Sequence, residues 1–161
     1  MRKAIDLLQK FEVILGSVML GIFLFAVVAQ MFTRYAGISA LWTEDVSMYS
    51  FIVSVFLGAA AMIRDDCHFA FTAIGDKVTD PRKKAALNIF IYLVIFVFCI
   101  FMFYYGVILT KKFWNYKWVS IPSFKRGPTW MCVPFSAFTM MIFLLEKIYD
   151  NSKILVKGGN N

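Results

Sequence analysis

The sequence has few of the residues on which metal, haem or nucleophilic chemistry depends. It contains one histidine, His68, and three cysteines, Cys67, Cys99 and Cys132, with no C-x-x-C spacing. Zinc sites and disulfide frameworks require paired ligands, and a haem held between two histidines cannot be built from one. A Gly-rich phosphate loop and an H-E-x-x-H motif are also missing. We therefore expect neither a cofactor nor an enzymatic activity.

Charge is missing from four long stretches of the chain. Segments 13–33, 46–63, 87–109 and 129–145 contain no charged residue, and the third of them is 23 residues long. A helix needs about 20 apolar residues to cross the roughly 30 Å hydrocarbon layer, and lipid offers no water to unpaired backbone groups. The sequence therefore predicts an all-α membrane protein. We expect one domain over residues 1–161, with four transmembrane helices and a flexible tail at 151–161.

Residues 2–12 allow two interpretations. They mix apolar and charged side chains in the pattern of a short amphipathic helix that lies in the membrane interface. They could equally lengthen the first span toward the N-terminus. The first apolar segment is too long for a signal peptide and lacks a small-residue cleavage site, so we expect it to be retained.

Positive charge exceeds negative charge, and its position indicates the topology. The formal net charge is +7, but the lysines and arginines lie in the tails and loops between spans, which favours membrane lipids over nucleic acid as their partner. Eleven of them fall in the N-terminus, the middle loop and the C-terminal tail, against six in the first and third loops. Because cytoplasmic segments carry the excess of Lys and Arg, both termini should face the cytoplasm.

Ionisable residues are missing from the interior of the predicted spans. Ion pathways and proton relays through membranes are marked by such residues, because they are costly to keep in lipid without a use. We place Glu12 at the edge of the first helix, outside the hydrocarbon. A transporter that cannot coordinate its own substrate needs another subunit, so the sequence predicts a partner.

The second span carries a stripe of small residues. Ser47, Ser50, Ser54, Gly58 and Ala61 follow one another at helical spacing along one face. Small residues let another helix approach closely, and serine hydroxyls can form hydrogen bonds across the contact. The stripe could face a partner or the other helices of this chain. If the stripe faces another helix closely in either case, Gly58→Leu should weaken the bundle or its complex by overpacking.

The stretch Trp42-Thr43-Glu44-Asp45 precedes the second span. Thr43 is a candidate N-cap, and carboxylates in a first helical turn are stabilised by the helix dipole. Trp42 is typical of a side chain anchored at the headgroups. Since one acid suffices for the dipole, we hypothesise that the other pairs with Arg34 or with a base on a partner.

Taken together, these residues resemble the small membrane subunit of TRAP transporters (tripartite ATP-independent periplasmic transporters), the DctQ-like family. The matching elements are an arginine–tyrosine pair, a W-x-E-D element, an F-L-G-A-A run, an R-x-x-x-H element and two later prolines. They correspond to Arg34–Tyr35, to Trp42, Glu44 and Asp45, to residues 56–60, to Arg64 and His68, and to Pro122 and Pro134.

The resemblance implies a scaffold in the bacterial inner membrane. Such a subunit pairs with a larger membrane subunit that holds the sodium and substrate sites, while a periplasmic binding protein delivers an organic acid of the sialic acid or C4-dicarboxylate type. We assign the partner interface to Arg34, Trp42, Glu44, Asp45, Ser47, Ser50, Ser54, Gly58, Arg64 and His68. The alternative is an autonomous four-helix exporter or a structural membrane protein.

Overall fold

Four long helices dominate the computed structural model, which describes residues 2–38, 40–64 and 81–157. These helices are α1 (Arg2–Tyr35), α2 (Trp42–Arg64), α4 (Pro81–Phe113) and α6 (Cys132–Lys157), and the single turn α5 (Gly127–Trp130) precedes α6. Each of the four is long and apolar enough to cross a membrane. The predicted four-helix membrane fold is confirmed.

The helices are longer than the charge-free segments. Residues 2–12 form the first turns of the 34-residue α1. Of the two interpretations given for them, the structure therefore agrees with the one in which they lengthen the first span. At the other end of the chain, α6 continues to Lys157 through residues predicted as a flexible tail. At 1.5 Å per residue α1 is about 50 Å long. It must therefore tilt or project beyond the roughly 30 Å hydrocarbon layer.

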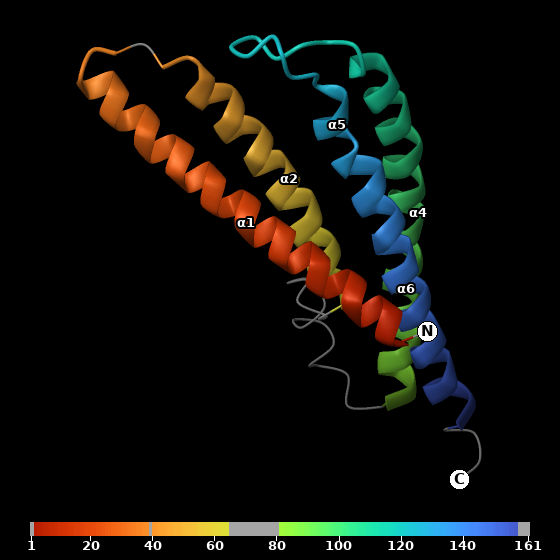
Figure 1. The fold of residues 1–161 in the computed structure, drawn as a ribbon. Coiled ribbons are helices and arrows are strands. Elements are labelled where there is room, and N and C mark those ends of the chain that lie inside the picture. Colours follow the sequence, from red (N-terminus) through yellow and green to blue (C-terminus); the bar gives the residue numbers. More distant parts are fainter. Residues whose placement is uncertain (1, 39, 65–80, 158–161) are drawn as a thin grey trace.

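The helices pack as two pairs that meet along α2 and α6. α1 lies beside α2, α4 lies beside α6, and the two pairs diverge toward the end that holds residues 36–41 and 114–126 (Figure 1). The N-terminus and the end of α6 lie at the opposite end, where α1 approaches α6. The distance between the two helix pairs is therefore set by the contacts that join one pair to the other.

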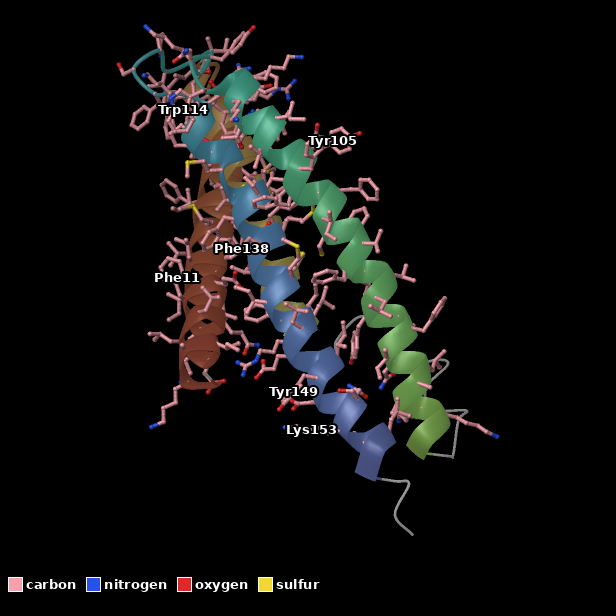
Figure 2. The ribbon with its side chains drawn as sticks, turned by 90° about the vertical axis from the view of Figure 1, so that its right-hand side faces the viewer. Phe11, Tyr105, Trp114, Phe138, Tyr149 and Lys153 are labelled. Carbon is pink, nitrogen blue, oxygen red and sulfur yellow. The ribbon has the colours of Figure 1, made fainter. Side chains whose placement is uncertain are left out.

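The core lies where α2, α4 and α6 meet, and most of α4 is outside it. The buried cluster consists of Ala60 and Ile63 from α2, Tyr92 and Cys99 from α4, and Met140, Phe143 and Leu144 from α6. Tyr105 and other aromatic side chains of α4 point away from the remaining helices (Figure 2). Their exposure is typical of side chains that face lipid.

The start of α6 packs closely on α4 because of Pro134. Proline has no backbone N–H, so the Trp130 carbonyl one turn earlier has no helical donor. The Thr110 hydroxyl of α4 donates to that carbonyl over 3.1 Å. A Cβ on Gly106 would lie only 3.1 Å from the Pro134 nitrogen, which shows how near the two backbones are. The helix is interrupted at Met131, three residues before the proline.

Candidate functional site

One guanidinium joins three helices at the end where the helix pairs converge. Arg64, the last residue of α2, donates from Nε to Glu146 Oε2 of α6 over 3.1 Å. Its Nη1 donates to Gln9 Oε1 of α1 over 2.9 Å, and its Nη2 forms an ion pair with Asp6 of the same helix. We call these four residues the Arg64 junction. Arginine suits this position because its planar fork carries five N–H donors, whereas lysine presents a single charged point.

The contacts of the Arg64 junction differ in exposure. The side chains of Arg64 and Glu146 are 16% and 14% exposed, while that of Asp6 is 51% exposed. Removing one member of a buried pair leaves the other charge uncompensated, whereas a solvated pair contributes little. The Arg64–Glu146 pair is therefore the energetically important contact. A polar pocket of about 420 Å³ adjoins it and is also lined by Asn88 of α4.

A second set of contacts holds residues 114–126 to the start of α2. Asp45 Oδ2 accepts a 2.7 Å hydrogen bond from the Ser120 backbone N–H, and the Ser120 hydroxyl donates to the Leu41 carbonyl over 2.8 Å. The ring of Trp118 stacks on Tyr49 with centroids 4.7 Å apart. We call these residues the Asp45 junction. It joins the two helix pairs at the end where they diverge, and the connecting loop reaches toward α2 there (Figure 1).

The Asp45 junction contradicts one of the two pairings proposed for the W-T-E-D stretch, the one with Arg34, while a pairing with a base on a partner stays a prediction. Asp45 is 6% exposed and binds a backbone N–H instead of a base. Within the described ranges no ion pair joins Arg34 to either acid; Arg34 and Glu44 are exposed and line one pocket of about 250 Å³. Thr43 is not the N-cap, because α2 begins at Trp42 and the Thr43 hydroxyl donates back to the Ala40 carbonyl over 2.7 Å.

The serine stripe faces this chain's own helices. Ser47, Ser50 and Ser54 are buried, and the first two donate to carbonyls within α2, so they do not form hydrogen bonds across to another helix. A Cβ on Gly16 of α1 would lie 3.7 Å from the Ser54 carbonyl and from the Gly58 nitrogen. The sequence left open whether the stripe faces a partner or the other helices of this chain. The structure shows it packed against α1.

Gly58 differs from the rest of the stripe. It is only half-buried, and a Cβ there would meet nothing within 4 Å. It therefore borders the exposed face of α2, which is made of Met48, Phe51, Val55 and Met62. Overpacking against the described residues is not expected for Gly58→Leu, and Gly58 is open to a close contact with another molecule. Of the other interface predictions, Trp42 is 45% exposed, and His68 lies outside the described residues.

Glu12 lies inside the helix bundle, which corrects its placement at a helix edge. Because α1 begins at Arg2, Glu12 falls well within the helix, and it is fully buried. Among the residues that the structure describes, neither of its carboxyl oxygens has a hydrogen-bond partner. The signal that could have revealed it is spacing, since Leu8, Glu12, Gly16 and Met19 lie on one helical face.

Comparison with known proteins decides the family. Residues 23–153 match the family described as tripartite ATP-independent periplasmic transporters, DctQ component. The chain belongs to this DctQ family. Family members are components of transporters and not enzymes, so this DctQ chain is a multi-pass membrane component of a TRAP transporter. Comparison with individual curated proteins found no match.

Proposed function

We propose that this DctQ chain is the small membrane subunit of a sodium-driven transporter and braces its large transport subunit. The observation that carries the proposal is the family match, which extends from the second half of α1 to the last turns of α6. A periplasmic binding protein delivers the substrate, an organic acid of the sialic acid or C4-dicarboxylate class. The complex lies in the bacterial inner membrane, with both termini of this chain in the cytoplasm, as the distribution of Lys and Arg favours.

The contacts of the charged side chains support a bracing role. Arg64, Glu146 and Asp45 are each bound to another helix or loop of this chain. Glu12 is fully buried and is not open to a passage. A substrate pathway needs accessible ionisable or polar groups inside the membrane. In the part of the chain that the structure describes, these groups hold helices together instead.

The exposed face of α2 is the surface proposed to contact the large subunit. Met48, Phe51, Val55 and Met62 leave it apolar, and Gly58 at its edge allows a second backbone to approach. Trp42, Glu44 and Arg34 lie at the same end of the helix pair and are exposed. From the predicted interface we therefore retain these three residues and Gly58, and His68 stays a prediction.

The function predicts that transport needs the partners. Liposomes that contain this chain alone should accumulate no labelled sialic acid or C4-dicarboxylate under an inward sodium gradient. Liposomes that also contain the large subunit should accumulate the acid once its binding protein is added. The measurement is radiolabel uptake with and without the gradient. Uptake by the lone chain would support the autonomous exporter and contradict the bracing role.

The interface predicts that Gly58→Leu weakens the complex and spares the isolated chain. The added side chain meets open space within this chain, but it would overpack a partner helix by about 1 to 3 kcal/mol. Co-purification with the large subunit, together with the melting temperature of the free chain, measures both effects. Phe98→Leu on the exposed surface of α4 is the control. Equal recovery of both variants would mean that Gly58 faces lipid.

A further inference from the structure

Glu12 is a buried acid that the proposed function does not use. It is fully buried on α1, and neither carboxyl oxygen has a hydrogen-bond partner in the described part of the chain. The Thr139 side chain of α6 lies close enough to interact with it. Thr139 and its neighbour Ser136 are themselves buried. The family match begins at residue 23, so family membership assigns nothing to Glu12.

No positive charge among the described residues compensates Glu12. The charged side chains closest along each helix to Glu12 and Thr139 are Lys10 and Asp6 on α1 and Glu146 on α6, and Arg64 is the last residue of α2. Arg64 is already bound to Asp6, Gln9 and Glu146, and Lys10 is exposed. The Glu12 carboxyl group is therefore buried without a positive charge beside it among the described residues. An ionised carboxylate without a charge partner or donors is strongly disfavoured in such a place.

The Thr139 hydroxyl also has the wrong polarity for a carboxylate. Its hydrogen is donated to the Ser136 carbonyl over 2.9 Å, so its oxygen remains available only as an acceptor. A carboxylate only accepts, whereas a protonated carboxyl group can donate its O–H. The ligand that complements this pair of groups is therefore a proton.

We propose that Glu12 is a proton-binding site, at which the neutral carboxyl group donates its O–H to Thr139 Oγ and links α1 to α6. The link requires the Glu12 side chain to turn, because neither carboxyl oxygen forms a hydrogen bond with the described residues. The proton is taken from water before α1 packs against α6, and the packed helices then keep it from solvent. The link adds a neutral contact between α1 and α6 near the charged Arg64 junction, whose Gln9 precedes Glu12 on α1.

Infrared spectroscopy tests the proposal directly. The full chain in an ester-free maltoside detergent at neutral pH should show the carbonyl band of a protonated carboxylic acid, and the band should shift in D₂O. Glu12→Gln keeps a neutral group with a donor, so the variant should fold with an unchanged melting temperature and lose that band. Glu44→Gln, the same change at an exposed acid, should keep the band and lose carboxylate absorption instead.

A second variant tests the acceptor. Thr139→Val removes the oxygen and preserves the shape of the side chain, so the Glu12 band should remain and move to the higher frequency of an unbonded acid. The proposal is overturned if the wild type lacks a protonated-acid band, if Glu12→Gln removes carboxylate absorption, or if Glu12→Gln fails to fold. An unmoved band in Thr139→Val would overturn the link to α6.

Discussion

Arg64→Met is expected to destabilise the chain by about 1 to 3 kcal/mol, between the cost of removing one partner from an exposed ion pair and the cost of doing so from a buried one. The apolar stem of methionine preserves the packing of the arginine stem. Glu146, which is 14% exposed, would nevertheless lose its charge partner, and Gln9 would lose a donor. The measurement is the free energy of unfolding in detergent, followed by denaturant titration. A loss of this size would remove a large share of the stability of a typical domain.

Two further variants distinguish the loss of the Arg64–Glu146 ion pair from a general loss of side-chain packing. Asp6→Asn should cost at most about 1 kcal/mol, since the Asp6 side chain is half exposed. The double variant Arg64→Met, Glu146→Gln should be more stable than Arg64→Met alone, because it removes the uncompensated charge. If Asp6→Asn is as damaging as Arg64→Met, the exposed pair holds the junction and our ranking is wrong.

The fold could be predicted because its cause is local. Each span is a charge-free run long enough to cross lipid, and neither the pairing of the helices nor their register is needed to recognise it. The ends of the helices were harder to place. Charged residues at 2–12 do not stop a helix, so α1 begins earlier than the apolar run. That difference moved Glu12 from a presumed edge to a buried position.

The contacts of the site could not be predicted because they depend on register between distant segments. Arg64 was identified as a notable residue, but its partner Glu146 lies 82 positions away, and only the packing of α2 on α6 brings them together. The partner of Asp45 carries no side-chain signature at all, since it is the backbone N–H of Ser120. Sequence patterns favour pairing an acid with a base, and the structure shows an acid that binds a loop backbone.

Asp45→Ala is expected to release residues 114–126 from the start of α2. It leaves the Ser120 N–H without its acceptor, which costs about 1 to 3 kcal/mol for a part-buried donor. Limited trypsin digestion should then cut faster at Lys117 and Lys125, whose side chains are exposed. Asp45→Asn retains a carbonyl acceptor and loses only its charge, so cleavage should fall between that of the wild type and that of Asp45→Ala.

Glu44→Gln is the matched control, because it changes the neighbouring acid in the same helical turn. Glu44 is exposed, and its side chain forms no hydrogen bond or ion pair with the described loop residues 114–126, so digestion should stay at the wild-type rate. Arg34→Gln should likewise leave the loop protected. Faster cleavage in Arg34→Gln that is not additive with Asp45→Ala would restore the pairing of Arg34 with Asp45. If cleavage is unchanged in both variants, the two acids have separate roles. Asp45 links the two helix pairs, and Glu44 is available to contact the large subunit. Co-purification of the large subunit should then fall in Glu44→Gln.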